Sequence, residues 1–570
     1  MVIKGILIIF YILSIIISIK LILENRDPSK TLIWILIFML FPGIGIFIYI
    51  ILGRNIRKIK INNTYKIANN MKKDRLLFNL EEMEQLAKCQ SEIIKEGKVP
   101  GYEEMDSRVL KVISLLLNTG IFPFTINNNV QVYIDGNEKF DNLIKDIRNA
   151  KDHIHLEYFI IKDSEIGNKI NKELIEKAKE GIKIRIIYDD VGCWRFWFHR
   201  SFFKEMKTYG IEIIPYLKGK IAIPVGGQLN YRNHRKIVVI DGKIGYTGGI
   251  NIGDEYIGKN KKFGYWRDTH IRIEGTSVYM LQMIFLTDWY YNTKEVLIKK
   301  NLFPKLSTKG NTMMQIVASG PDSDWESMHY AYFYAICQAK KSIYIETPYF
   351  IPDESLLKAL KCAALSGVEL IILFPKIADH KIVNTASYSY FQEILESGGK
   401  VYLYNKGFLH SKVIIIDDFM ASTGSANMDL RSFKLNFEVN AFIYDRQLIE
   451  EIKEDFMYDF KMLKNEKIEL IDDFFQLYID EAIKDYTVII TNMRLLILDF
   501  PNTAKNFKED LRASQRLYYI RKKVIIFEIR LDEIKKVVKE KEFLKLYVSD
   551  EQYLLINNNK NSREIIEKIL

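Results

Sequence analysis

A histidine, a lysine two residues later and an aspartate five residues after that occur twice in this chain. The first copy is His234, Lys236 and Asp241, and the second is His410, Lys412 and Asp417. Both copies continue with an asparagine seventeen residues after the histidine, Asn251 in one and Asn427 in the other. Two stretches that agree at so many fixed offsets indicate an internal repeat rather than chance.

The residue types in the two copies suit chemistry on a phosphodiester. His and Lys at i and i+2 on a strand point to the same face, so each copy offers an imidazole beside an ammonium. If the copies meet across a pseudo-two-fold axis, two histidines, two lysines and two asparagines surround one cleft. One histidine can attack phosphorus while the other protonates the leaving alkoxide, and the lysines neutralise the phosphate oxygens. We therefore expect no metal and no other cofactor, since lysine is a poor metal ligand.

The two aspartates of the repeat allow two interpretations. Each aspartate comes seven residues after its histidine. Because this offset is odd, its side chain would point to the opposite face of a strand. Each aspartate also lies at the end of an expected strand. Asp241 is followed by Gly242, and Asp-Gly is a signal for a tight hairpin turn. The pattern alone leaves open whether Asp241 and Asp417 belong to the site or only to turns.

Strands and helices alternate around both copies, which predicts an α/β fold with parallel layers. We expect two tandem α/β sandwich domains related by a pseudo-two-fold axis, at residues 126–300 and 301–465, after a helical connector at 61–125. The expected strands are 154–161, 182–190, 211–216 and 234–241 in the first domain, and 343–351, 368–374, 400–404 and 410–417 in the second.

The first 60 residues contain two apolar runs, at 5–23 and 31–52. A bilayer core of about 30 Å needs about 20 helical residues, so both runs are long enough to be transmembrane helices. Arg54, Arg57, Lys58 and Lys60 follow the second run, and the positive-inside rule then places both ends in the cytoplasm. A cleaved signal peptide or a pair of buried core helices is the alternative. We expect a multi-pass protein of the cell membrane with its main domains on the cytoplasmic side.

The composition excludes some classes of protein. The chain has 570 residues, is 48% hydrophobic and 27% charged, and this balance excludes a mainly disordered chain. Its 4 cysteines form no CxxC pair, which argues against a disulfide framework or a cysteine zinc site. The net charge of +10 fits either an anionic partner or scattered surface lysines.

The paired motifs, each followed by Gly-x-x-Asn, resemble those of the phospholipase D superfamily. Longer strings narrow the resemblance to bacterial cardiolipin synthases: LNYRNHRKIVVIDGKIGYTGGINIGDEYIG, YWRDTHIRIEG, IETPYFIPD, GFLHSKVIIID and TGSANMDLRSFKLNFEVN. The resemblance covers roughly residues 1–460. It implies two phospholipase D-like domains that transfer a phosphatidyl group between two phosphatidylglycerol molecules, giving cardiolipin and glycerol without a cofactor.

The resemblance also implies roles for individual residues. One histidine forms a phosphatidyl-histidine and the other acts as acid and then base; His234 is favoured over His410 as the nucleophile, but the symmetric pattern leaves this open. Lys236, Lys412, Asn251 and Asn427 would hold phosphate oxygens, and Asp268 and Glu438 would orient the histidines. Asp241 and Asp417 belong to the family motif, which favours a place in the site. Ser425 stands where the first copy has Gly249, which leaves the first half one hydroxyl donor short.

Residues 470–570 depart from the family pattern. They predict a hairpin at 486–500, further strands at 524–531, 543–549 and 552–556, and a closing helix at 562–570. This small α+β domain weakly resembles bacterial pleckstrin-homology-like domains. Its basic stretch at 505–523, and the aromatic stretch at 194–200, are either contacts to anionic lipid or headgroups or ordinary loops.

Three functions remain after these observations. The first is the cardiolipin synthase reaction on phosphatidylglycerol at an anionic membrane. The second is a membrane phospholipase D that uses water, and the third is a phosphodiesterase on nucleic acid. Even for a synthase, another lipid alcohol could replace the second phosphatidylglycerol as the acceptor. A nucleic-acid phosphodiesterase is disfavoured by the apolar N-terminal runs, so we expect no nucleic-acid partner; a homo-oligomer remains open.

Overall fold

The computed structural model describes residues 2–23, 28–49, 77–96, 105–193, 200–216, 231–297, 300–306 and 310–464, and after residue 467 it describes seven strands. The predicted lipid-contacting stretch at 194–200 falls outside these ranges except for Arg200.

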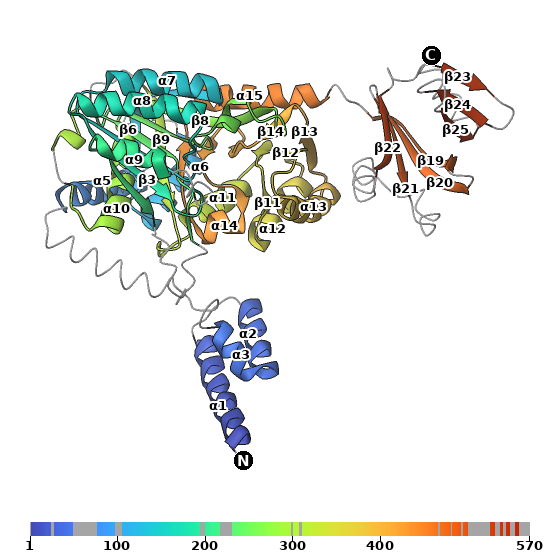
Figure 1. Cartoon of the computed structure of the whole chain (residues 1–570), viewed down its shortest axis with the longest axis horizontal. Coiled ribbons are helices and arrows are strands. Elements are labelled where there is room, and N and C mark those ends of the chain that lie inside the picture. Colours follow the sequence, from blue (N-terminus) through green and yellow to red (C-terminus); the bar gives the residue numbers. More distant parts are fainter. Residues whose placement is uncertain are drawn as a thin grey trace.

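A mixed sheet of 16 strands forms the centre of the body (Figure 1). Its first half contains β1 (Phe124–Asp135), β2 (His153–Tyr158), β3 (Lys183–Asp189), β4 (Glu212–Tyr216), β5 (Arg232–Asn233), β6 (Ile237–Ile240), β7 (Ile244–Gly248) and β8 (Tyr265–Glu274). Its second half contains β9 (Thr312–Ser319), β10 (Ser342–Glu346), β12 (Glu369–Pro375), β13 (Lys400–Tyr404), β14 (Gly407–Leu409), β15 (Val413–Ile416), β16 (Met420–Gly424) and β18 (Asn436–Ile443). The short strands β11 (Phe350–Ile351) and β17 (Met428–Asp429) pair with each other.

The order of the strands is the same from either edge of the sheet. It runs β4-β3-β2-β6-β7-β8-β1 through the first half and β13-β12-β10-β15-β16-β18-β9 through the second. The halves join where β1 and β9 pair in antiparallel fashion. The predicted pair of tandem α/β domains with pseudo-two-fold symmetry is therefore confirmed.

The expectation of parallel layers is correct only for the outer strands of each half. β2, β3 and β4 are parallel, whereas β6, β7 and β8 are antiparallel. The reason lies in the turn between β6 and β7, where Asp241 and Gly242 have φ values of 54° and 64°. A turn of this length joins only antiparallel neighbours.

Helices cover both faces of the sheet. They are α5 (Leu77–Glu96), α6 (Ser107–Thr119), α7 (Gly136–Asn149), α8 (Glu165–Lys179), α9 (Arg200–Thr208), α10 (Ser277–Thr293), α11 (Ser327–Cys337), α12 (Glu354–Leu365), α13 (Lys381–Glu396), α14 (Leu430–Lys434) and α15 (Arg446–Lys464). α7 and α8 lie side by side over the first half in Figure 1, and their apolar side chains pack on β2 and β3. One apolar core combines α10 and α15 with central strands of both halves, including Val239 of β6 and Ile415 of β15. This shared core holds the two motif copies in one rigid frame.

The N-terminal runs form three helices, α1 (Val2–Leu23), α2 (Pro28–Leu40) and α3 (Pro42–Ile48). The second run is interrupted at Pro42, which cannot donate the backbone hydrogen bond that a continuous helix needs. Leu21, Phe38 and Ile46 pack together between these helices. None of the described helices reaches the combined length and hydropathy of a membrane span.

The described C-terminal strands form two antiparallel sheets. β19 (Ile468–Ile479), β20 (Ala482–Thr491), β21 (Arg494–Asp499) and β22 (Ile525–Arg530) make the first sheet, and β23 (Lys536–Lys539), β24 (Phe543–Tyr547) and β25 (Tyr553–Asn557) make the second. The predicted hairpin is present as β20 and β21, and β22, β24 and β25 fall on the other predicted strands. The predicted helix at 562–570 and the basic stretch at 505–523 lie outside the described residues.

Candidate active site

His234 lies in the segment between β5 and β6 and contacts the second half of the molecule. Its backbone N–H donates to the carbonyl oxygen of Phe437 at 2.9 Å. Its Nδ1 lies 2.9 Å from Oε2 and 3.1 Å from Oε1 of Glu438, a residue of β18. The expectation that His234 and Lys236 are strand residues is wrong, because β6 begins only at Ile237.

His410 repeats this arrangement in the opposite direction. Its backbone N–H donates to the carbonyl oxygen of Arg267 at 2.7 Å. Its Nδ1 lies 2.7 Å from Oδ2 of Asp268, a residue of β8 in the first half. Each histidine is therefore oriented by a carboxylate from the other half, and neither half contains a complete pair. The sequence pointed to both acids but not to this crossing.

Two short strands explain why the pairs cross. β5, which precedes His234, pairs in parallel with β18 of the second half. β14, which precedes His410, pairs in parallel with β8 of the first half. Each histidine thus follows a strand that lies beside the acid-bearing strand of the other half.

The glycine and serine that distinguish the two copies lie directly behind the carboxylates. The Ser425 hydroxyl donates to Oε2 of Glu438 at 2.5 Å. A side chain at Gly249 would place its Cβ 2.0 Å from Oδ1 of Asp268, so no residue larger than glycine fits there. The shorter aspartate has moved into the space that the serine occupies in the other half.

Asp268 receives different hydrogen bonds in place of that hydroxyl. The backbone N–H of Thr269 donates to Oδ1 at 2.8 Å, and the indole Nε1 of Trp266 donates to Oδ2 at 3.4 Å. Both of these donors are N–H groups, and they take the place of the hydroxyl that Gly249 does not supply to the first half. The string YWRDTHIRIEG contains Trp266, but its residue pattern does not predict this contact.

Lys236 and Lys412 are buried at the same centre. The Nζ of each donates to the carbonyl oxygen of its own histidine, His234 or His410, at 2.5 Å. Burial lowers the pKa of Lys236 to about 7 and that of Lys412 to about 8. The Lys412 charge adds to the lowering at Lys236, which places both motif copies within electrostatic reach of each other.

The histidines and their acids influence each other's protonation. Burial lowers the pKa of His234, and it lowers that of His410 to about 4 together with the Lys412 charge. Burial would raise the pKa of Glu438 and Asp268, but the neighbouring histidine, the buried lysine and the hydrogen bonds to each carboxylate together outweigh it and hold both below their ordinary values. The site thus favours neutral imidazoles facing ionised carboxylates.

The two asparagines have different surroundings. Asn251 accepts a hydrogen bond from the backbone N–H of Ile160 at 3.2 Å and donates to the Tyr256 hydroxyl at 2.9 Å. The buried Oδ1 of Asn427 has no hydrogen-bond partner among the described residues.

Asp241 and Asp417 are not brought to the histidines. The Asp241 carboxylate accepts from the backbone N–H groups of Lys151, Asp152 and His153 at 2.8, 2.7 and 3.1 Å. Asp417 accepts from Lys340, Lys341 and Ser342 at 2.9, 2.7 and 2.9 Å and is paired with Arg108. Both aspartates lie at the ends of β6 and β15 farthest from the histidines. These contacts favour the turn interpretation that the sequence left open.

Aromatic rings surround the two imidazoles, and sequence reasoning missed them. The ring centroid of Phe159 lies 5.1 Å from that of His234. The ring centroids of Trp266 and Phe408 lie 5.1 and 5.9 Å from that of His410. These rings limit the access of water to the histidines.

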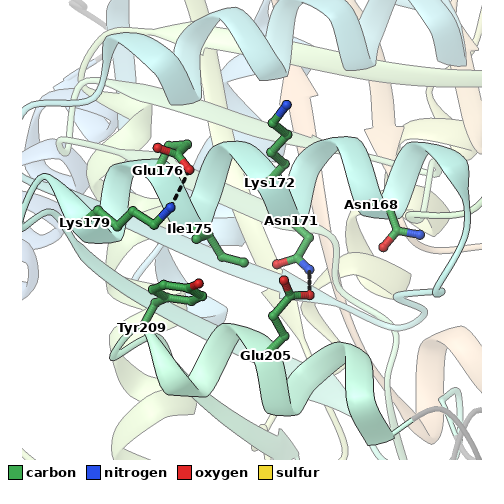
Figure 2. A pocket seen from close by; sticks show the side chains of 8 residues that line it. All are labelled: Asn168, Asn171, Lys172, Ile175, Glu176, Lys179, Glu205 and Tyr209. Atoms are coloured by element: carbon green, nitrogen blue, oxygen red, sulfur yellow. Dashed lines mark hydrogen bonds and ion pairs between the residues drawn. The ribbon is translucent and has the colours of Figure 1, made fainter.

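Two further observations concern other kinds of binding site. No group of His, Cys, Asp and Glu residues suited to a metal ion occurs in the part of the chain that the structure describes. A surface pocket between α8 and α9, shown in Figure 2, contains none of the predicted site residues; it is lined by Asn168, Asn171, Lys172, Ile175, Glu176, Lys179, Glu205 and Tyr209.

Two family models match parts of this chain. A family model described as cardiolipin synthase, PLD-like domain, matches residues 143–279 and 332–460. A second model, described as phospholipase D-nuclease N-terminal, matches residues 8–54. Each half of the body thus matches the first model around one motif copy.

Whole-length relatives agree with these models. The cardiolipin synthase of Alkalihalophilus pseudofirmus is 43% identical over 458 residues, which are 80% of this chain and 88% of that protein. That of Halalkalibacterium halodurans is 44% identical over 445 residues, 78% of this chain and 85% of that protein. The major cardiolipin synthase ClsA of Bacillus subtilis is 42% identical over 470 residues, 81% of this chain and 94% of that protein. The chain belongs to the cardiolipin synthase family of phospholipase D-like enzymes.

Proposed function

We propose that this enzyme forms cardiolipin and glycerol from two phosphatidylglycerol molecules through a phosphatidyl-histidine intermediate. The observation that supports this mechanism best is the crossed pairing of His234 with Glu438 and of His410 with Asp268 around two buried lysines. Since Nδ1 of each histidine faces a carboxylate, Nε2 remains for the reaction. Two equivalent nitrogens at one anion site suit a reaction in two displacement steps.

In the first step, Nε2 of one histidine attacks the phosphorus of a phosphatidylglycerol molecule. The bond from phosphorus to the glycerol headgroup breaks, and the second histidine gives an Nε2 proton to the departing alkoxide. That histidine must therefore be an imidazolium when the anionic substrate is bound, and it leaves this step neutral. Lys236 and Lys412 would neutralise the phosphate oxygens while charge builds up on them, together with the side chains of Asn251 and Asn427. Glycerol leaves, and the phosphatidyl group stays on the first histidine.

In the second step, the second histidine takes a proton from a headgroup hydroxyl of another phosphatidylglycerol. The resulting oxygen attacks phosphorus and the phosphorus–nitrogen bond breaks, which releases cardiolipin and restores both histidines. Water in place of that hydroxyl would give phosphatidic acid. The aromatic rings around His234 and His410 favour the lipid alcohol because they restrict access by water.

We also propose that residues 5–23 and 31–52 anchor the enzyme in the cell membrane, with the body on the cytoplasmic side. Large apolar side chains on the N-terminal helices are exposed, for example Ile9, Leu32 and Phe47 at 58%, 60% and 65%. Such a surface is unfavourable in water and suits lipid. The cations at 54–60 favour the cytoplasmic orientation.

The domain boundaries at 126–300, 301–465 and 470–570 are part of the same proposal. The last domain, as a pleckstrin-homology-like module, would adjust membrane docking or self-association rather than chemistry. A chain that ends near residue 465 should then keep its transfer rate in detergent but lose part of its membrane localisation. Full activity with identical localisation would contradict this role.

Incubation of the purified protein with phosphatidylglycerol alone, in the presence of a chelator, tests the reaction. We expect cardiolipin and glycerol in equal amounts by mass spectrometry, and loss of both by about a thousandfold or more in His234→Ala and in His410→Ala. Phosphatidic acid as the main product would instead identify a hydrolase. Product that appears only with another lipid alcohol would overturn phosphatidylglycerol as the acceptor.

A further inference from the structure

One buried arginine lies beside each of the two histidine–acid pairs. Arg235 and Arg267 are 6% and 2% exposed. Nε of Arg235 donates to the backbone carbonyl oxygen of Glu438 at 3.2 Å. Nη1 of Arg267 donates to the backbone carbonyl oxygen of Asp268 at 2.7 Å. On both sides of the centre, a guanidinium therefore holds the main chain of the acid that orients a histidine.

Each arginine is also tied to a helix of the core that both halves share. Arg235 is ion-paired with Asp288 of α10, and Nε of Arg267 donates to the Asp459 carboxylate of α15 at 2.5 Å. The two helix carboxylates are buried as well. α10 and α15 both belong to the apolar core that combines strands of the two halves. Each guanidinium thus joins an acid-bearing strand, β18 or β8, to this core.

The two arginines do not occupy equivalent places in the repeat. Arg235 directly follows the histidine of its copy, where the second copy has Ser411. Arg267 directly precedes the acid of β8, whereas the acid of β18 is preceded by Phe437. The same contact to the carbonyl oxygen of the acid is therefore made from two different positions in the chain. Duplication of the strands alone does not account for that, but a shared need for the contact does.

The contacts of each acid fix both of the peptide groups that flank it. The carbonyl oxygen before Asp268 accepts from the backbone N–H of His410, and the carbonyl oxygen of Asp268 itself accepts from Arg267. Glu438 has the same two contacts, with the histidine and the arginine of its own side. Since peptide groups are planar, two fixed neighbours leave the Cα–Cβ bond of the acid with one direction. That direction carries the carboxylate to Nδ1 of the histidine.

The arginines are connected to the histidine segments as well as to the acids. Nη1 of Arg267 also donates to the Thr269 hydroxyl at 3.0 Å. That hydroxyl oxygen lies 2.7 Å from the hydroxyl oxygen of Ser411, which directly follows His410. On the other side, Arg235 itself directly follows the histidine. Each arginine therefore couples the position of a histidine to the position of its acid.

We propose that Arg235 and Arg267 are positioning residues for phosphatidyl transfer, each holding the carboxylate of Glu438 or Asp268 against its histidine. The inference rests on the two-histidine reaction proposed above. Because the arginines are buried, they act through the acids and not on the lipid. Lysine keeps the charge but lacks the planar fork that bonds a carboxylate and a carbonyl oxygen together. Replacement by lysine should therefore release the peptide group of the acid.

Rates of cardiolipin formation by the full-length protein, per folded molecule, test this role in wild type, Asp268→Asn and Glu438→Gln. In wild type, Arg267→Lys should lower kcat about tenfold and change KM about twofold at most, because a misplaced acid slows the chemical step. In Asp268→Asn it should cost about twofold at most, because the acid that it positions is already removed. In Glu438→Gln it should still cost about fivefold or more. Arg235→Lys should show the reverse pattern.

Thermal unfolding of each variant reports whether it is folded. If a lysine variant does not fold, Asp459→Asn or Asp288→Asn takes its place, since each weakens the same guanidinium contact with a side chain of the same shape, and the same pattern is expected. Arg272→Lys is the matched control. Arg272 also lies on β8, but the described hydrogen bonds of its guanidinium go to the carboxylates of Asp146 and Glu274. This control should unfold at a lower temperature, with its rate within about twofold in all three backgrounds.

Two results would overturn the positioning role while leaving the transfer reaction intact. One is an unchanged kcat in both lysine variants. The other is a cost that is equal in the two acid backgrounds, as expected of arginines that only support the fold. Full activity of Asp268→Asn and Glu438→Gln would instead contradict the histidine–acid mechanism itself, and the role of the arginines with it.

Discussion

The two halves of the body share one topology but hold their histidines in different ways. Around His234, the carboxylate is Glu438, and it is supported by Ser425 and Asn436. Around His410, the carboxylate is Asp268, and aromatic residues replace the polar neighbours. The fold requires a carboxylate on each side but does not require the same carboxylate. The crossing of the histidine–acid pairs makes the two sides depend on each other.

Among the variants that compare the two sides, those that remove the charge of either acid should lower cardiolipin formation most. Glu438→Gln and Asp268→Asn keep the shape but weaken the orientation and the stabilisation of the imidazolium, so we expect losses of about a hundredfold or more in cardiolipin formation. The rate of product formation under saturating phosphatidylglycerol measures this. Since each acid serves the histidine of the other half, combining both changes should cost less than the product of the two losses. Fully multiplicative losses would mean that the two pairs act independently.

Exchanging the small residues behind the acids should affect the halves unequally. Gly249→Ser introduces a Cβ 2.0 Å from the Asp268 carboxylate. Asp268 lies in β8, and the backbone N–H of Gly249, directly after β7, is hydrogen-bonded to Thr269 of that strand, so neither group can easily move away. We expect about a thirtyfold loss of activity from displaced Asp268, on the scale of 2 kcal/mol. Ser425→Gly only removes one hydrogen bond to Glu438 and should cost about fivefold. Steady-state rates of both variants give the comparison, and equal losses would show that the asymmetry has no steric origin.

The two lysines make a prediction about pH. With a pKa of about 7 for Lys236 and about 8 for Lys412 in the free enzyme, the ammonium forms disappear as pH rises through this range. The phosphodiester does not titrate there, so kcat/KM for phosphatidylglycerol should fall by about tenfold or more between pH 7 and pH 9. A profile of kcat/KM that stays flat over this window would contradict charged lysines as the phosphate ligands.

Stability should change in the opposite direction over the same window. Both lysines have folded-state pKa values below the ordinary value of 10.5, so the unfolded chain binds more protons between about pH 7 and 10.5. The contribution of these two lysines to the free energy of unfolding must then rise with pH across this range. Thermal unfolding at several pH values, with Lys236→Met as the control that removes the contribution, measures this trend.

The turn aspartates should show the smallest effect on chemistry. Asp241→Asn and Asp417→Asn weaken hydrogen bonds to backbone N–H groups and should cost about 1–3 kcal/mol of stability each. Asp417→Asn should cost more, because Asp417 also pairs with Arg108 of α6. Thermal unfolding in detergent tests the order, while the rate per folded molecule should stay within about threefold. A loss of rate as large as that of a histidine variant, without a loss of stability, would show that these aspartates take part in the reaction.

Much of this arrangement could be predicted from the sequence because it is repeated there. The spacing of His234 and His410 with their lysines predicted a two-fold site, and the alternation of apolar strands and helices predicted the tandem domains. The Asp-Gly pair after β6 also predicts a turn, although the alternation of strands and helices favours parallel neighbours. Residue types and their spacing were sufficient to predict a feature wherever it depends on residues that are close together in the sequence.

Features that depend on contacts between the halves were not predictable. Which acid faces which histidine is decided by the pairing of β5 with β18 and of β14 with β8, strands of two and three residues that have no periodicity to recognise. The fit of Gly249 against Asp268 depends on the same register. Short strands and long-range register carry this information, and a single sequence does not reveal either.

Identification of the covalent intermediate tests the two-histidine account most directly. The protein would be mixed with phosphatidylglycerol, quenched within the first turnover and digested, and the phosphatidyl-modified peptide identified by mass spectrometry. We predict modification of either His234 or His410 but not both, and its loss when the modified histidine is replaced. Cardiolipin formation with no modified histidine, or with the phosphatidyl group on another residue, would contradict the account.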